Sequence, residues 1–233
     1  MKTAIISGAS VGIGAAAASR FIAGGYRVFN LSRRQCPVDG VTSLPCDLSD
    51  PTAIESAIGE LLPTVQESSG VALVHNACQM LKDSASDCPD ENLQASLQTN
   101  VIAANTLNRA LLPAMPEGSS VLYIGSTLSE KAVPGSFSYV ISKHAVVGMM
   151  RATCQDLMGS GIHTACICPG FTDTEMLRTH LGNDQAIVDS IASLNSFNRL
   201  IDPDEIASLI CWAHDNPVIN GAVLHANLGQ KES

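Results

Sequence analysis

The chain has 233 residues and a formal net charge of −9. This acidic balance excludes the basic surface that nucleic-acid binding requires. Hydrophobic residues make up 45% of the chain and charged residues 15%, which is enough apolar material for a sizeable core. The apolar stretches are short and interrupted by Gly, Ser or Pro, so we expect neither a membrane span nor a signal peptide.

Eight cysteines are scattered without Cys-x-x-Cys spacing, so we predict no metal site. Free thiols without an export signal indicate the reducing cytoplasm.

Short apolar runs alternate with helical patterns along the whole chain. The runs predict strands at Thr3–Ile6, Arg27–Leu31, Val41–Leu44, Val71–His75, Val121–Ile124, His163–Cys168 and Ala222–Ala226. The longer patterns predict helices near residues 13–23, 51–66, 90–114, 137–158 and 203–214. Asp50-Pro51 is typical of a helix start, and so is Asp202-Pro203, where Glu205 completes a capping box.

Strands that are apolar throughout, each followed by a helix, indicate a parallel sheet covered on both faces. Right-handed crossovers then favour a doubly wound Rossmann-type α/β fold with about seven parallel strands and helices on both faces. We find no repeat or linker and therefore expect one domain spanning residues 1–233. Residues 171–200 are irregular and rich in Thr, Asn and Ser, which predicts a mobile substrate flap.

A glycine-rich turn follows the first predicted strand. Glycines at positions 8, 12 and 14 let the backbone turn tightly and let a pyrophosphate approach the start of the next helix. The free N–H groups and the dipole of a helix N-terminus favour such an anion. The alternative is an ordinary glycine turn without a ligand.

Tyr139 and Lys143 are four residues apart, so on a helix their side chains leave the same face. A nearby ammonium favours the phenolate and so lowers the pKa of a tyrosine toward neutrality. Such a pair also arises by chance on exposed helices, and its meaning therefore depends on the other motifs.

These motifs together resemble the short-chain dehydrogenase/reductase family. Asp47-Leu48 matches its acidic residue after the third strand, and His75-Asn-Ala-Cys78 stands where the family has Asn-Asn-Ala-Gly. Ser126 precedes Tyr139 by 13 residues, the family's usual interval. Pro169-Gly170 with Thr174 resembles the segment whose threonine meets the nicotinamide carboxamide. The resemblance covers essentially the whole chain.

The resemblance implies a catalytic set of Asn100, Ser126, Tyr139 and Lys143. Ser126 would hydrogen-bond the substrate oxygen and Tyr139 would act as general acid or base. Lys143 would lower the pKa of the tyrosine and hold the nicotinamide ribose, and Asn100 would kink its helix and hold a water of a proton relay. The cofactor-binding residues would be Gly8, Ser10, Val11, Gly12, Ile13, Gly14, Ser32, Arg33, Arg34, Asp47, Leu48, Asn76, Ala77, Tyr139, Lys143, Pro169, Gly170, Thr172 and Thr174.

The residues at the tip of the second predicted strand indicate which of the two nicotinamide cofactors binds. An acid there binds the 2′-hydroxyl of NAD and repels a 2′-phosphate. This chain has Ser32 followed by Arg33 and Arg34, which suits a phosphate dianion and favours NADP(H) over NAD(H). Arg33 is the stronger candidate, and the alternative for Arg34 is a solvated loop residue.

The chain departs from the family pattern at three places. Ser7 replaces a threonine and keeps its hydroxyl. Cys78 replaces a glycine, which would cost of order 1 kcal/mol if that position needs a positive φ. The C-terminal Leu224-His-Ala-Asn-Leu-Gly229 lacks the family's Asp-Gly-Gly, which affects the expected subunit packing. We interpret His144 and the other histidines as structural.

The sequence thus predicts an NADP(H)-dependent oxidoreductase that interconverts a carbonyl and a secondary alcohol. One alternative is a non-catalytic NADP(H)-binding sensor, and 3-oxoacyl thioesters are an alternative substrate class. The resemblance to the family implies a homodimer or homotetramer formed through the helices near 90–114 and 137–158.

Overall fold

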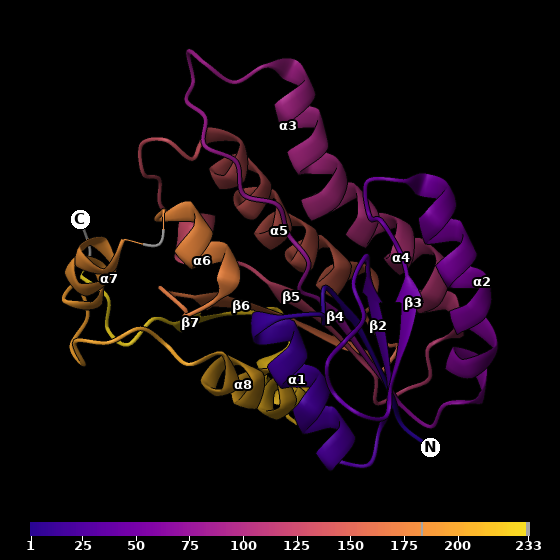
Figure 1. Cartoon of the computed structure of the whole chain (residues 1–233). Coiled ribbons are helices and arrows are strands. Elements are labelled where there is room, and N and C mark those ends of the chain that lie inside the picture. The colour runs from indigo at the N-terminus through magenta and orange to yellow at the C-terminus, as the bar shows by residue number, and fades with distance from the viewer. Residues whose placement is uncertain (183, 232–233) are drawn as a thin grey trace.

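The computed structural model describes residues 1–182 and 184–231, so residue 183 of the predicted flap and residues 232–233 of the predicted domain lie outside the described residues. All seven predicted strands form a single parallel sheet in the order β3-β2-β1-β4-β5-β6-β7 (Figure 1). The strands are β1 (Thr3–Ser7), β2 (Arg27–Ser32), β3 (Val41–Pro45), β4 (Val71–His75), β5 (Ser120–Ile124), β6 (His163–Pro169) and β7 (Ala222–Ala226). This order confirms the predicted doubly wound fold.

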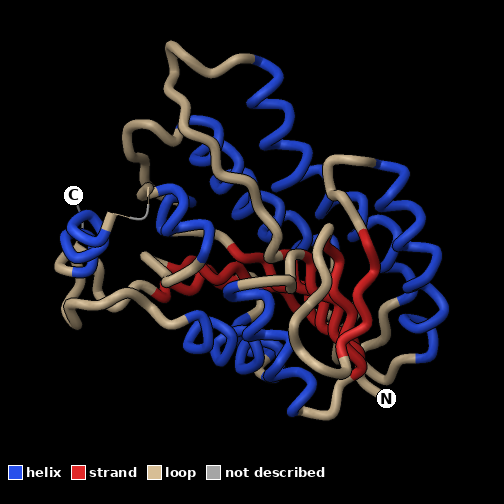
Figure 2. The backbone as a smooth tube through the Cα atoms, in the orientation of Figure 1, coloured by secondary structure: helices blue, strands red, loops and turns tan. Residues whose placement is uncertain are grey.

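Helices cover both faces of the sheet (Figure 2). The α-helices are α1 (Gly12–Ala23), α2 (Pro51–Glu67), α3 (Asp90–Leu97), α4 (Ala103–Leu111), α5 (Phe137–Asp156), α6 (Glu175–His180), α7 (Gln185–Ala192) and α8 (Pro203–Asp215). One buried cluster joins the sheet to α1 and α8, and a second joins it to α2, α4 and α5. The residues of β1, β4, β5 and β6 are all buried, as expected for strands covered on both sides.

Both predicted helix starts are confirmed. The Asp50 carboxylate accepts a hydrogen bond from the N–H of Thr52 (2.9 Å) at the start of α2. At α8, Asp202 accepts from the N–H of Asp204 (2.8 Å), while Glu205 accepts from the N–H of Asp202 (2.9 Å). These caps satisfy N–H groups that the first helical turn leaves without partners.

The predicted helix at 90–114 is divided. A π-helical segment, Gln98–Ile102, separates α3 from α4, and a short 3₁₀ turn, Leu112–Ala114, follows α4. Asn100 lies at the centre of the π-helical segment. Hydrophobic periodicity does not reveal one extra residue in a helical turn, and such segments often occur at functional sites.

Residues 171–200 are more regular than their composition predicts. They include α6 and α7, which begin where Thr174 accepts a hydrogen bond from Leu177 N–H (3.2 Å) and Asp184 accepts from Ala186 N–H (2.9 Å). Thr174, one of the residues whose type suggested an irregular segment, therefore caps one short helix, and Asp184 caps the other.

Candidate active site

The glycine-rich turn between β1 and α1 requires its glycines. Gly8 and Gly12 have φ values of +73° and +56°, and a Cβ on Gly8 would lie 2.9 Å from the Cα of Ala77. The residue before α1, Val11, makes no side-chain cap, and within the described part of the chain no side chain caps the N–H groups of the first turn of α1. Ser10 lies in the turn, whereas Ile13 and Gly14 lie in the first turn of α1. A backbone cradle of this kind has room and free N–H groups for an anionic pyrophosphate, which is the ligand that the sequence predicts.

Ser7 joins this turn to the turn after β4. Its hydroxyl accepts hydrogen bonds from the N–H groups of Asn76 (3.0 Å) and Ala77 (3.1 Å). The amide of Asn76 donates in return to the carbonyls of Ser7 and Gly8, both at 3.0 Å. The side chain of Asn76 therefore braces the glycine turn from behind.

Cys78 occupies its position without the conformational cost that a positive φ would bring. The non-glycine residues with positive φ in the described part of the chain are Asn198 and Leu228. The Cys78 thiol lies 3.8 Å from the sulfur of Met176 in α6. The cysteine thus contacts the helix that follows Thr174.

The tip of β2 carries two arginines in different surroundings. Arg34 forms an ion pair with Glu175 of α6, with Nη1 and Oε1 3.3 Å apart, and the Ser32 hydroxyl donates to the carbonyl of Arg34 (2.6 Å). Arg33 has no ion-pair partner within 4.0 Å in the described part of the chain. Hydrogen bonds from Ser49, with a smaller contribution from the charge of Arg33, lower the pKa of Asp47. Arg33 is therefore the less engaged of the two cations.

Asn100 uses its side chain to join three segments. Its amide oxygen accepts from the N–H of Gln79 (2.7 Å), and its amide nitrogen donates to the carbonyl of Gln79 (2.9 Å) and to the hydroxyl of Ser142 (2.9 Å). The π-helical turn, the loop after β4 and α5 are thereby held together beside Lys143.

Ser126 follows β5 and begins a short 3₁₀ turn, Thr127–Ser129. Its hydroxyl accepts from the N–H of Leu128 (3.1 Å), and the Ser129 hydroxyl accepts from the N–H of Ser126 (3.1 Å). This capping box fixes the serine, and the Ser126 hydroxyl opposes the rise that burial causes in the pKa of Tyr139.

Tyr139 and Lys143 lie on α5 with their side chains buried. The Lys143 ammonium donates to the carbonyl of Ile124 at the end of β5 (2.7 Å) and lies 5.5 Å from the centre of the Tyr139 ring. The pair therefore faces the carboxyl end of β5, where Ser126 follows.

The pKa of Tyr139 differs from the expectation. Burial raises this pKa, and the charge of Lys143 and the Ser126 hydroxyl act in the opposite direction without outweighing burial. Burial also acts to lower the pKa of Lys143, but the negative charges that Cys78 and Tyr139 carry when ionised raise it overall. The protein by itself therefore holds a neutral phenol beside an ammonium, rather than a phenol titrating near neutrality.

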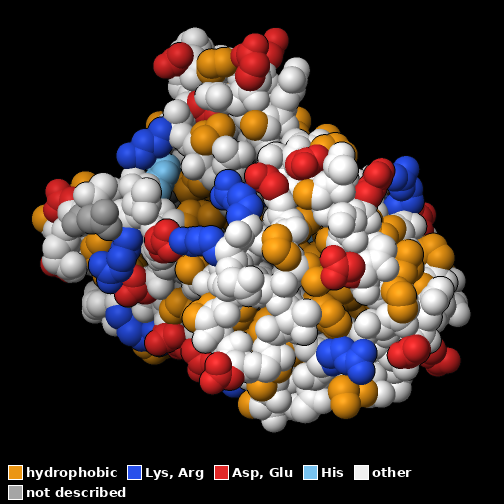
Figure 3. All heavy atoms as spheres, turned by 45° about the vertical axis from the view of Figure 1, so that its right-hand side comes forward, with side chains coloured by type: hydrophobic (Ala, Val, Ile, Leu, Met, Phe, Trp, Pro, Cys, Tyr) orange, Lys and Arg blue, Asp and Glu red, His pale blue; other side chains and the backbone are white. Residues whose placement is uncertain are grey.

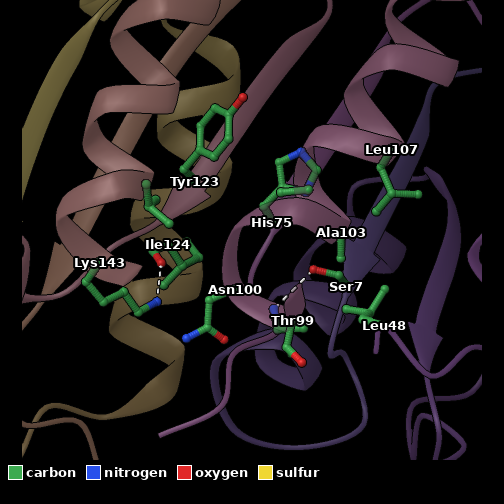
Figure 4. Close-up of a pocket in the computed structure, with 13 residues that line it drawn as sticks. Ser7, Leu48, His75, Thr99, Asn100, Ala103, Leu107, Tyr123, Ile124 and Lys143 are labelled. Atoms are coloured by element: carbon green, nitrogen blue, oxygen red, sulfur yellow. Dashed lines mark hydrogen bonds between the residues drawn. The ribbon is translucent and has the colours of Figure 1, made fainter. Parts of the chain in front are cut away.

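A cavity of about 10 Å³ lies beside Lys143, with room for about one water molecule, and Figure 4 shows the residues that line it. Its lining includes Lys143, Asn100, Ser7 and His75, together with apolar side chains such as Leu48. Burial lowers the pKa of His75 to about 4, and its Nε2 lies 2.8 Å from the Asn108 Oδ1. His75 is therefore a neutral, hydrogen-bonded residue, which agrees with the structural interpretation.

The segment after β6 returns to the glycine turn. A Cβ on Gly12 would lie 3.1 Å from the methyl group of Thr174, so these two residues are in close contact. Pro169 ends β6, and Gly170 packs closely on Asn227. Thr172 is buried, and its hydroxyl donates to the carbonyl of Gly170 (3.1 Å). Thr172 therefore supports the backbone of this segment from inside.

The structure brings the predicted residues together at the carboxyl edge of the sheet, as expected for a parallel α/β fold. The sequence did not reveal the contacts that tie α6 to this edge, those of Glu175 with Arg34 and of Met176 with Cys78. The paired residues are 141 and 98 positions apart, and no local pattern relates them.

A family model and several known proteins match almost the whole chain. A family model described as enoyl-(acyl carrier protein) reductase matches residues 8–231. The 2-keto-3-deoxy-L-fuconate dehydrogenase of Xanthomonas campestris pv. campestris is 29% identical over 225 residues, which cover 91% of this chain and 73% of that protein. The 3-oxoacyl-[acyl-carrier-protein] reductase of Salmonella typhimurium is 26% identical over 240 residues, covering 98% of this chain and 96% of that protein.

Among solved structures, a short-chain dehydrogenase from Burkholderia cenocepacia in complex with NADP has a TM-score of 0.88 and 28% identity, covering 98% of this chain and 97% of that chain. No helix in the described part of the chain is long and apolar enough to cross a membrane. The family match spans nearly all of the chain. It agrees with the observed fold and indicates an enzyme that acts on alcohols and carbonyl compounds. This protein is an oxidoreductase that belongs to the short-chain dehydrogenase/reductase family.

Proposed function

We propose that the protein is an NADP(H)-dependent reductase of small ketones or aldehydes that also catalyses the reverse oxidation. The observation that supports this most strongly is the buried pair of Tyr139 and Lys143 facing the carboxyl end of β5, with Ser126 close to the phenol. A buried ammonium beside a neutral phenol is suited to proton transfer.

Each residue of the set has a role in the reductive direction. When bound, a nicotinamide cofactor would supply the hydride chemistry, and the residues of this chain would orient the carbonyl and handle the proton. Ser126 donates a hydrogen bond to the carbonyl oxygen and stabilises the negative charge that develops there. Tyr139 donates its proton to that oxygen as the alcohol forms. Lys143 stabilises the resulting phenolate through its positive charge, and the water-sized cavity beside Asn100 offers a place for a proton-carrying water.

The start of α1 and the tip of β2 are the proposed cofactor contacts. The N–H groups of the first turn of α1 would bind the pyrophosphate, and Gly8 and Gly12 let it approach the backbone. Asp47 and Leu48 would border the adenine, while Ala77, Pro169 and Thr174 would border the nicotinamide half. Lysine and arginine side chains border a hollow on the face seen in Figure 3, although the chain carries a net charge of −9.

Arg33 is the proposed ligand of the 2′-phosphate. It lacks an ion-pair partner in the described structure, whereas Arg34 is paired with Glu175. Both side chains of that pair are 58% exposed, so the pair is weak and Arg34 can turn to the phosphate as a secondary contact. The residues of the strand tip itself, Ser32, Arg33 and Arg34, include no acid that would repel a 2′-phosphate, and the carboxylate that reaches the tip is that of Glu175.

The test is a comparison of NADPH and NADH over a panel of ketones, in the wild type and in Arg33→Ala. The wild type should prefer NADPH, and Arg33→Ala should lower kcat/KM for NADPH about 10- to 100-fold, because a charged hydrogen bond contributes roughly 1.5–3 kcal/mol. The NADH value should stay unchanged. Arg27→Ala is the matched control, because Arg27 lies at the other end of the same strand. Equal wild-type rates with the two cofactors would refute the proposed specificity.

The 3-oxoacyl thioesters are a second candidate substrate class, supported by the likeness to the Salmonella reductase. An acidic carrier protein would need a basic docking patch near the site. Arg178 is paired with Asp173 and Arg199 with Glu205, so these two arginines offer little unneutralised charge. A small free carbonyl compound is therefore the preferred substrate.

All four positions of the catalytic set are occupied by the expected residue types, which disfavours a non-catalytic sensor.

We further propose one domain spanning residues 1–233, a substrate flap at 171–200, a cytoplasmic location and a homodimer or homotetramer. The cysteines are unpaired thiols, which suits a reducing compartment. Assembly through α4 and α5 agrees with the exposed side chain of Ile102 next to α4. Light scattering of the purified protein measures the number of subunits.

A further inference from the structure

Asp83 is a buried carboxylate in the loop between β4 and α3, far in sequence from the residues that it contacts. We propose that Asp83 is a positioning residue for Tyr139, because it caps and anchors the first turn of α5. This inference rests on the proposed function, since it assumes that Tyr139 is the acid/base group.

Asp83 is connected to the start of α5 through both its side chain and its backbone. Its Oδ1 accepts from the N–H of Ser138 (3.0 Å), and its carbonyl accepts from the N–H of Phe137 (3.3 Å). Its own N–H donates to the carbonyl of Gly135 (3.3 Å). These two backbone hydrogen bonds make up a parallel bridge between Asp83 and Ser136. The two residues that immediately precede Tyr139 are therefore fixed from one side by one residue.

The start of α5 has no equivalent support of its own. Ser136 makes no side-chain cap, and the first turn of α5 contains no acidic residue. A carboxylate accepting from the second N–H of a helix satisfies an unpaired donor and interacts favourably with the helix dipole. In α2, α7 and α8 a local aspartate performs this task, whereas in α5 it comes from 55 residues away.

The second carboxylate oxygen is also held in place, because the Cys88 thiol donates to it (3.4 Å). Burial acts to raise the pKa of Asp83, but hydrogen bonds from Ser138, Cys88 and Phe137 lower it overall. The group is therefore a carboxylate at neutral pH, and the cap carries a negative charge.

Asp83 should affect Tyr139 more than Lys143. Lys143 has a separate anchor, the carbonyl of Ile124, one turn further along α5. The first intrahelical hydrogen bond after the cap, from Val140 N–H to the Ser136 carbonyl (2.9 Å), closes the turn that contains Tyr139. Without Asp83 this turn can fray, and a displacement of about 1 Å at a reacting group can reduce a rate about 100-fold.

The test compares Asp83→Ala, Asp83→Asn and Asp202→Ala, each assayed for kcat, the Kd of NADPH and the melting temperature. Asp202 caps α8, which lies on the opposite face of the sheet and carries no candidate site residue, so its replacement controls for the loss of a cap alone. Asp83→Ala should lower kcat about 10- to 100-fold with the Kd of NADPH unchanged. The kcat of Asp83→Asn should lie between those of Asp83→Ala and the wild type, because the amide oxygen still accepts a hydrogen bond from the N–H of Ser138.

Asp202→Ala should lower the melting temperature and leave kcat unchanged. If Asp83→Ala keeps the wild-type kcat, or if Asp202→Ala loses kcat by the same factor, Asp83 has no positioning role. If Asp83→Ala does not fold, Asp83→Asn provides the test: a wild-type kcat together with wild-type amide exchange at residues 137–140 would refute the positioning role.

The Tyr139→Phe variant separates the positioning role from the proposed function. If Tyr139→Phe loses turnover and Asp83→Ala does not, only the positioning role fails. If Tyr139→Phe keeps turnover, the proposed function fails.

Discussion

Tyr139 and Lys143 share one buried environment, and the competition between burial and charge sets their protonation states. Burial raises the pKa of the phenol more than the neighbouring ammonium lowers it. The residue types and their spacing indicated the interaction with Lys143 but not the depth of burial. The structure therefore changes the expectation: before the reaction Tyr139 is protonated, which is the form that a proton donor needs.

The pH dependence of reduction follows from this direction. Because only the neutral phenol can donate, kcat with saturating NADPH should be constant from about pH 6 upward and fall as the pH rises through the raised pKa of Tyr139. Initial rates across that range, with circular dichroism to exclude unfolding, measure the profile. A kcat that increases as the pH rises through neutrality would show that the ionised phenol is the active form.

At the scale of elements, α6 contacts the glycine-rich turn, the loop after β4 and the tip of β2, which are the proposed cofactor contacts. Thr174 contacts Gly12, Met176 lies beside Cys78, and Glu175 pairs with Arg34. The composition of residues 171–200 suggested only a flap, because capped helices of six and eight residues show too little periodicity to be recognised. The predicted flap thus contains a short helix that reaches the tip of β2.

Glu175 places a carboxylate close to the proposed 2′-phosphate site. Glu175→Gln should lower the KM for NADPH about two- to fivefold, because it removes a repulsive charge and releases Arg34. The free energy of unfolding should change by less than about 1 kcal/mol, as expected for an exposed ion pair. Glu60→Gln, an exposed acid on α2, is the matched control. A higher KM for NADPH in Glu175→Gln would show that the ion pair itself supports cofactor binding.

At the scale of the whole molecule, the sequence predicted the sheet and most of the helices closely. Fully buried strands such as β4 and β6 are continuous apolar runs, and caps such as Asp50-Pro51 mark helix starts within a few residues. The candidate site was predictable where a motif is local, as for Tyr139 and Lys143. It was not predictable where residues meet through the fold, as for Asp83 and Ser138, because no spacing rule connects two loops joined only in three dimensions.

The measurement that tests the proposed chemistry most directly is the single-turnover rate of ketone reduction by Tyr139→Phe with bound NADPH. Removing the hydroxyl should reduce this rate at least about 100-fold, the usual contribution of a general acid, while the Kd of NADPH stays at the wild-type value. A rate within tenfold of the wild type, with NADPH still bound, would contradict the assignment of Tyr139 as the proton donor.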